Sequence, residues 1–202
     1  MRKNLVFALG ITALLGLNSF AETPKFSLGA TGGILINDGI TGARHESRRY
    51  VVGPSVEARF TDHFGLEFNA LYRRLGATST FNGADQTIVN RHRGNSWEFP
   101  LLGKFYFSGQ EKKIQPFVST GWAFRKIWND GDVTTFGPGD ATSRDRITGS
   151  SDTGVGAVFG GGVRVGQGRV SFSPEFRYTR WGAQSGFPTG RNQVDFLVGV
   201  RF

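Results

Sequence analysis

Apolar and polar residues alternate along several segments of the chain, and the last segment shows this pattern most clearly. In residues 192–202 every second residue from Val194 to Phe202 is apolar, whereas Asp195 and Arg201 fall on the alternate positions. Successive side chains of a strand point to opposite faces, so this segment predicts a strand with one apolar and one polar face. Such a strand suits a soluble core, and it also suits a membrane barrel whose apolar face meets lipid.

Seven earlier segments show the same period of two. They cover residues 26–36, 50–60, 66–73, 97–107, 115–125, 154–165 and 170–179. With the terminal segment they give eight predicted strands, an even number that can close into an antiparallel barrel. The predicted fold is therefore all-β, an eight-stranded antiparallel up-and-down transmembrane β-barrel.

The connections between the predicted strands alternate in length. The short connections cover residues 61–65, 108–113 and 166–168, and the long ones cover residues 37–48, 76–95, 128–151 and 182–191. Outer-membrane barrels have short periplasmic turns and longer external loops. We therefore expect long, mobile external loops on one rim and both chain termini on the periplasmic side.

Aromatic residues predict a girdle at each rim, because Tyr and Trp prefer membrane interfaces. At the long-loop ends of the strands the sequence has Tyr50, Tyr72, Trp97, Trp128, Tyr178 and Trp181. At the short-turn ends it has Phe26, Phe60, Phe107, Phe172 and Phe202.

The N-terminus has the pattern of a secretory signal peptide: Arg2 and Lys3, an apolar run over residues 5–17, and the small residues Ser19 and Ala21. We expect cleavage after Ala21, which gives a signal peptide over residues 1–21 and one barrel domain over residues 22–202. A membrane anchor helix is the alternative, but the run is shorter than the roughly 20 residues that a helical span needs.

Composition narrows the class of protein further. The chain has no cysteine, so no disulfide holds it together after export. Its 30 glycines and 13% aromatic residues fit strands and turns better than helices. The net charge of +8 falls to +6 without Arg2 and Lys3, and no concentrated basic stripe with interleaved aromatics indicates nucleic-acid binding.

If the apolar faces meet lipid, the opposite faces bring charged residues into the barrel lumen. They are Glu57, Arg59, Glu67, Arg73, Glu98, Lys104, Arg125, Arg164, Glu175, Arg177, Asp195 and Arg201. Isolated charges would be very costly there. The two signs nearly balance, and side chains can fill an eight-stranded interior. We expect a salt-bridged plug, and the alternative is a narrow passive, porin-like channel with a slight preference for anions.

Little in the sequence indicates catalysis, a metal or a cofactor. The three histidines, His45, His63 and His92, fall in predicted loops or turns. The segment His45-Glu46-Ser47 has a His-x-Ser spacing like that of lipid A deacylases. A lipid A-modifying enzyme therefore stays a remote alternative. Asp130-Gly131-Asp132 lacks the downstream acidic ligand of a calcium loop and predicts a flexible acidic loop.

Arginines gather at the predicted outer rim. They are Arg44, Arg48 and Arg49 in the first long loop and Arg74, Arg91 and Arg93 around the second. Guanidinium groups bind phosphate in bidentate fashion. We therefore expect these arginines to contact lipopolysaccharide phosphates. The alternative is that they only keep the loops well solvated.

The whole mature chain resembles the small outer-membrane β-barrel proteins of the opacity, OmpA and OmpX type. The passages that carry the resemblance are residues 97–105, residues 174–181 and the terminal Phe202. The resemblance implies that Val200 and Phe202 belong to the signal read by the barrel assembly machinery, although Leu197 stands where that signal often has Gly. It implies a fold and a location in the bacterial outer membrane but little chemistry.

The sequence thus predicts a non-enzymatic integral outer-membrane protein with a structural or surface-interaction role. Its expected partners are outer-membrane lipid and lipopolysaccharide, with the barrel assembly machinery during biogenesis, and it is expected to be a monomer.

Overall fold

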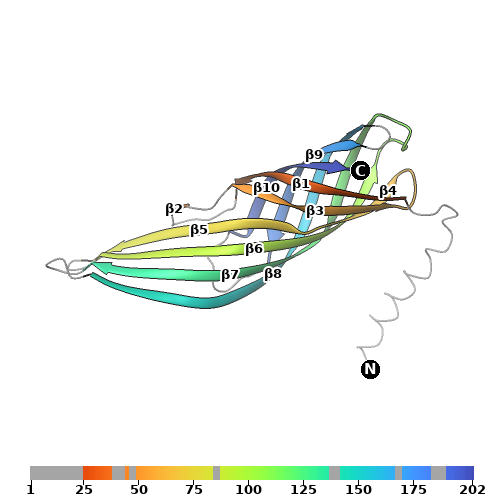
Figure 1. Ribbon diagram of the computed structural model, residues 1–202. Helices are drawn as coiled ribbons and strands as arrows, with labels where there is room; N and C mark the ends of the chain where they lie inside the picture. Colours follow the sequence, from red (N-terminus) through yellow and green to blue (C-terminus); the bar gives the residue numbers. More distant parts are fainter. Residues whose placement is uncertain are drawn as a thin grey trace, which may run out of the picture.

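The computed structural model describes residues 25–37, 44–45, 49–83, 87–136, 142–166, 170–182 and 190–202. Ten β-strands are present (Figure 1): β1 Lys25–Asn37, β2 Arg44–His45, β3 Tyr50–Arg59, β4 Phe64–Asn69, β5 Leu71–Asn82, β6 Thr87–Tyr106, β7 Ile114–Phe136, β8 Thr142–Gly166, β9 Ser171–Trp181 and β10 Asn192–Arg201. Within this part of the chain, no helix has the length and apolarity needed to cross a membrane. The predicted signal peptide lies outside the described residues.

The strands form one closed antiparallel barrel. β1 pairs with β10 on one side and with β3 on the other, so the first strand joins the last. β4 and β5 together make one barrel strand, interrupted at Ala70, whose backbone N–H donates to the Pro54 carbonyl (3.1 Å). The two-residue strand β2 pairs only with the far part of β5 and is not part of the barrel. Without β2, and with β4 and β5 counted as one, the barrel has eight strands, which confirms the predicted fold class.

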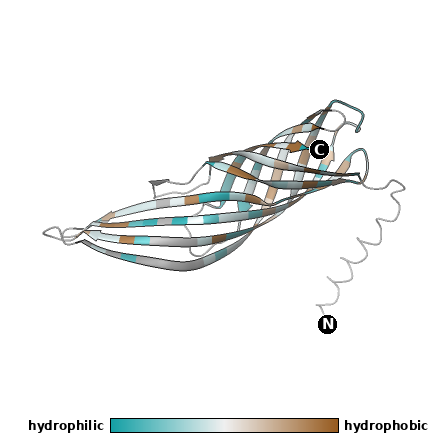
Figure 2. Ribbon diagram, viewed as in Figure 1, coloured by the Kyte–Doolittle hydropathy of each residue, from teal (hydrophilic) through white to brown (hydrophobic). Residues whose placement is uncertain are grey.

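Apolar side chains lie on the outside of the barrel and polar side chains on the inside. Phe26, Trp122 and Phe176 are 71%, 64% and 60% exposed, whereas the alternate positions of the same strands are mostly buried. The hydropathy colours alternate along the strands accordingly (Figure 2). The rings of Phe176 and Phe196 are in contact, with their centroids 4.9 Å apart, because the two residues are cross-strand neighbours on this outer face. In a soluble sandwich the same rings would instead pack between two sheets. The arrangement is that of a barrel surrounded by hydrocarbon.

Four strands continue far beyond the barrel. β8 pairs with β9 only from Gly156 onward, so residues 142–155 extend past it, on the order of 45 Å at about 3.3 Å per residue. β5, β6 and β7 run alongside as an antiparallel sheet, and the edge of β5 pairs with β2. We call residues 76–82, 87–95, 128–136 and 142–151 the projecting sheet; it forms the left half of Figure 1.

The projecting sheet shows that two of the four predicted long loops are wrong. Residues 76–95 and 128–151 were expected to be long loops, and both are mainly strand. Their polar and small side chains hide the period of two that lipid contact imposes on the barrel, but backbone hydrogen bonds continue across all four strands. The other two predicted long loops, over residues 37–48 and 182–191, lie largely outside the described residues.

Candidate functional sites: the lumen network and the outer rim

The twelve charged residues predicted for the lumen, here called the lumen network, all belong to strands of the barrel. All of them are buried except Arg164, whose side chain is 17% exposed. They come from β3, β4, β5, β6, β7, β8, β9 and β10. Alternation along each strand turns them inward, and barrel closure brings residues distant in the sequence together.

The middle of the lumen network is organised around Glu67 on β4. Its carboxylate lies 2.5 Å from Lys104 Nζ and 3.4 Å from Arg177 Nη2, and it also contacts Arg201 Nη2. Asn69 donates a further hydrogen bond to it (2.8 Å). One carboxylate thus holds cations from β6, β9 and β10.

Glu175 reinforces this centre from β9. It pairs with Arg177 at 3.1 Å and with Lys104 at 3.4 Å, and it accepts a hydrogen bond from the Ser119 hydroxyl at 3.0 Å. Gly160 leaves room for these groups, because a Cβ there would lie 2.4 Å from Ser119 Oγ and 2.5 Å from Glu175 Oε1. Side chains are therefore closely packed around Gly160 at this level.

A second cluster lies toward the projecting sheet. Glu98 pairs with Arg73 (3.4 Å) and with Arg125 (3.3 Å), and Arg73 also reaches Asp195 (3.0 Å). Gln193 links the cluster: its amide donates to Asp195 (2.7 Å) and Glu98 (3.3 Å), and its oxygen accepts from Arg125 (2.6 Å). Two carboxylates and two guanidinium groups balance here.

A third cluster lies at the short-turn end, around Glu57. This carboxylate pairs with Arg164 (3.3 Å) and Arg201 (3.2 Å), and it accepts a hydrogen bond from the Tyr106 hydroxyl (2.7 Å). Arg59 stacks on the Tyr106 ring, 3.8 Å from its centroid. Cations outnumber carboxylates in this cluster.

Several inward residues were missed by the sequence analysis. Trp181 was predicted for the outer aromatic girdle, which is wrong: it is 2% exposed, its Nε1 donates to Gln193 (3.0 Å), and Arg125 lies over its ring at 3.6 Å. Its odd number gives it the parity of Arg177 and Thr179, so strict alternation along β9 would have placed it correctly. Apolar side chains that also face the lumen are Val51, Leu71, Leu75, Leu102, Ala123, Ile127, Val158 and Leu197.

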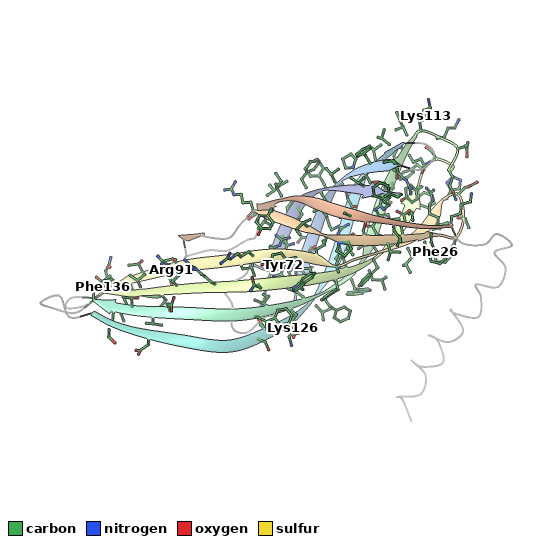
Figure 3. The ribbon with its side chains drawn as sticks, viewed as in Figure 1. Phe26, Tyr72, Arg91, Lys113, Lys126 and Phe136 are labelled. Atoms are coloured by element: carbon green, nitrogen blue, oxygen red, sulfur yellow. The ribbon has the colours of Figure 1, made fainter. Side chains whose placement is uncertain are left out.

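The predicted outer-rim arginines are only partly brought together. Arg74, Arg91 and Arg93 are exposed and have the outward parity of Tyr72 and Trp97, and Arg91 lies along the projecting sheet in Figure 3. Arg91 and Arg93 stand opposite Asp132 and Asp130 in the register of β6 and β7. The sequence had placed these aspartates in a flexible loop, but they belong to β7.

Two of the other three predicted rim arginines lie in the described part of the chain. Arg44 is in β2, opposite Thr78 in the register, and Thr78 also stands opposite Arg91. Arg49 accepts a backbone hydrogen bond from Leu35 (2.6 Å), and Arg48 lies outside the described residues.

The residues considered for chemistry are scattered. His63 is in the turn before β4, where its Nδ1 is 2.8 Å from the Tyr106 carbonyl. His92 is in β6 and His45 in β2, so neither is in the loop expected. Over the described ranges, no group of three or more His, Cys, Asp or Glu side chains is arranged to hold a metal ion. Glu46 and Ser47 of the deacylase-like spacing lie outside those ranges.

Comparisons with known proteins agree with this architecture. A family model described as outer membrane protein beta-barrel domain matches residues 10–182. No curated protein matches the chain.

Several solved structures are similar to the chain. The N-terminal β-barrel domain of Pseudomonas aeruginosa OprF is 17% identical with a TM-score of 0.44, over 89% of this chain and 100% of that one. Ail of Yersinia pestis is 11% identical with a TM-score of 0.41, over 89% and 97%. Neisserial surface protein A is 16% identical with a TM-score of 0.41, over 89% and 98%.

Proposed function

Because the chain belongs to the outer membrane protein beta-barrel domain family, we propose that it serves the bacterial outer membrane as a surface-interaction protein carried on a closed barrel. The observation that carries this proposal is the projecting sheet. A transmembrane strand needs about 9–11 residues, whereas β8 has 25. The additional length builds a broad polar surface outside the membrane, which a purely structural barrel does not need.

The lumen network supports a closed barrel over a channel. Glu67 and Glu175 tie cations from three strands together in the middle of the lumen. Conducting an ion along this path would require breaking buried pairs, which is strongly unfavourable. In a planar bilayer we expect the purified protein to give no steady single-channel openings. Reproducible openings of uniform size would favour the narrow channel instead.

The projecting sheet faces the cell exterior and the short turns face the periplasm in this proposal. The arrangement agrees with the short turn over residues 107–113 at the opposite end of the barrel. An epitope inserted between β5 and β6 should be labelled by antibody on intact cells. The same epitope in the turn between β6 and β7 is the control and should be labelled only after permeabilisation. The reverse result would overturn the orientation.

Lipopolysaccharide is the proposed partner at the outer rim. Arg74 is the next outward residue after Tyr72, and Arg93 follows Trp97 and Asn95 on the outward face of β6. Lipid headgroups meet an aromatic girdle at about this level. Replacing both arginines with Gln should reduce retention of purified lipopolysaccharide, because each loses a charge-assisted phosphate contact. Lys112→Gln and Lys113→Gln at the opposite end form the matched control. If the variant without Arg74 and Arg93 retained as much lipopolysaccharide as the unaltered protein, the proposed contact would be wrong.

Val200 and Phe202 are proposed to be read by the barrel assembly machinery. Phe202 is 70% exposed at the end of β10, and its backbone N–H donates to the Leu28 carbonyl (2.8 Å). Phe202→Ala should slow insertion in cells while leaving refolding in detergent intact. Equal effects on both processes would indicate a role in stability only.

A further inference from the structure

A cavity of about 240 Å³ opens at the short-turn end of the barrel, the end marked by Phe26 and Lys113 in Figure 3. Four cationic residues line it: Lys25, Arg59, Arg164 and Arg201. No acidic side chain is among the residues that line it. Pockets for drug-sized ligands measure about 300–1,000 Å³. This cavity therefore suits a small anion or a single headgroup.

Arg59 is the group whose charge most needs a partner. It is 6% exposed, and its guanidinium donates to two neutral oxygens, Gln115 Oε1 (2.7 Å) and the Asp62 carbonyl (2.6 Å). Its third donor, Nε, has no hydrogen-bond partner in the described part of the chain. No carboxylate of the described residues lies within ion-pair distance of it. Glu57 and Asp62 offset its charge only from beyond ion-pair distance. Burying a cation without a direct anionic partner is costly, so an anion in the cavity would stabilise it.

Glu57 cannot serve as that anion. It is the acidic residue of the short-turn cluster, and Arg164 and Arg201 already share its carboxylate. The cluster around Glu98 is balanced, whereas Arg201 is shared between Glu57 and Glu67. The seven cations of the lumen network exceed its five carboxylates, and Arg59, Arg164 and Arg201 place that excess beside this cavity.

Ser171 supplies a second unused donor. Its side chain is 4% exposed and lines the cavity, and its hydroxyl has no hydrogen-bond partner among the described residues. A hydroxyl and a guanidinium N–H are complementary to the oxygens of a phosphate group. Ser171 is in β9 and Arg59 in β3, and barrel closure makes both residues part of the wall of one cavity.

The turn over residues 108–113 holds the cavity in shape. Gln115 donates to the Gln110 carbonyl (3.1 Å) and the Lys112 carbonyl (2.8 Å), and Gln110 accepts from Lys25 Nζ (3.3 Å). Gln115 is also the residue that accepts from Arg59. The cationic wall is thereby fixed before any ligand arrives, which lowers the entropic cost of binding.

We infer that this cavity is a binding site for a phosphate group, distinct from the outer-rim site and independent of the surface role proposed above. Arg59 and Ser171 provide the direct donors, and Lys25 and Arg164 provide the surrounding positive charge. Occupancy would neutralise the excess charge and close the barrel at its short-turn end.

Titration of the refolded protein with inorganic phosphate tests the inference, in a maltoside detergent that carries no phosphate. Amide chemical shifts in ¹⁵N-labelled protein should change saturably, and the changes should be confined to the residues around the cavity. Arg59→Gln should weaken binding about tenfold or more, as loss of a hydrogen bond to a charged group predicts. Ser171→Ala should weaken it severalfold. Arg180→Gln removes the same charge from the exposed outer face and should leave binding unchanged.

Two further ligands distinguish the source of the phosphate group. If the site takes a lipid headgroup, a short-chain phosphatidylglycerol should bind more tightly than glycerol phosphate, and if it takes a free anion, glycerol phosphate should bind at least as well. Either order supports the inference. Shifts in the unaltered protein that do not saturate, or an equal loss of affinity in Arg59→Gln and Arg180→Gln, would overturn it. The first criterion needs no variant and holds even if a variant fails to fold.

Discussion

The barrel and the projecting sheet are built from the same continuous strands, yet different forces specify them. In the barrel, apolar residues face outward, charged residues face inward, and closure gives every strand two neighbours. In the projecting sheet most residues are polar or small, with a few exposed aromatic residues such as Phe81 and Phe136 among them. Residues 142–151 of β8 form an edge with no partner strand among the described residues. Alternation along this chain therefore marks contact with lipid, and pairing continues where alternation ends.

The sequence along this edge of the projecting sheet is charged. Residues 144–146 read Arg-Asp-Arg. Charged residues on an exposed edge oppose association with the edges of other sheets. The barrel needs no such device, because closure removes its edges.

The largest expected effect lies in the middle of the barrel. Glu67→Gln leaves Lys104, Arg177 and Arg201 with weaker partners, so the free energy of unfolding should fall by about 3–5 kcal/mol, the usual cost of breaking a buried ion pair. Urea unfolding in lipid vesicles measures this. Glu111→Gln, in an exposed turn, is the control and should change stability little. Equal effects would mean that the lumen network is not what stabilises the barrel.

Two adjacent glycines sharpen the difference between the inside and the outside of the barrel. Gly160→Ala places a methyl group against Ser119 and Glu175 and should cost about 1–3 kcal/mol, as overpacking does. Gly161→Ala points outward, 3.7 Å from the nearest atom, the Phe117 carbonyl oxygen, and should be neutral within about 0.5 kcal/mol. The same unfolding measurement compares them. A larger loss for Gly161→Ala would reverse the inside and outside assigned to β8.

Trp181 offers a smaller test of the same division. Trp181→Phe keeps an aromatic ring under Arg125 but removes the hydrogen bond to Gln193, so it should cost about 1 kcal/mol. Trp122→Phe, on the outer face, is the control and should cost less. If the two substitutions were indistinguishable, the indole N–H of Trp181 would not be part of the lumen network.

The smallest effect on stability is expected from the projecting sheet. Replacing residues 77–92 and residues 131–147 each with Asn-Gly, a dipeptide that favours two-residue hairpins, would shorten both hairpins at paired positions. The barrel strands remain, so the unfolding free energy should stay within about 0.5 kcal/mol of the full chain. Heat-modifiable mobility on a gel and urea unfolding check this. A variant that no longer refolds would show that the two regions depend on each other.

These contrasts also define what could be predicted from the sequence. The eight barrel strands and the inward face of each were predicted, because lipid outside and a charged lumen inside impose opposite polarity on alternate residues. The partners within the lumen network could not be, because the stagger of eight strands decides that Glu67 meets Arg201 and that Arg73 meets Asp195. The projecting sheet was missed for a different reason: Thr, Ser, Gly and Asn on both faces have the composition of a loop, whereas strand pairing depends on the backbone.

If the apolar faces of the strands meet lipid and the alternate faces meet the lumen, tryptophans on the two faces should differ in their access to the acyl chains. The chain has four tryptophans, so two variants, each retaining only Trp122 or only Trp181 and carrying Phe at the other three positions, can be refolded into vesicles with brominated acyl chains. Bromine quenches fluorophores that it can approach. The structure predicts strong quenching of Trp122 and weak quenching of Trp181; strong quenching of Trp181 with protection of Trp122 would contradict it.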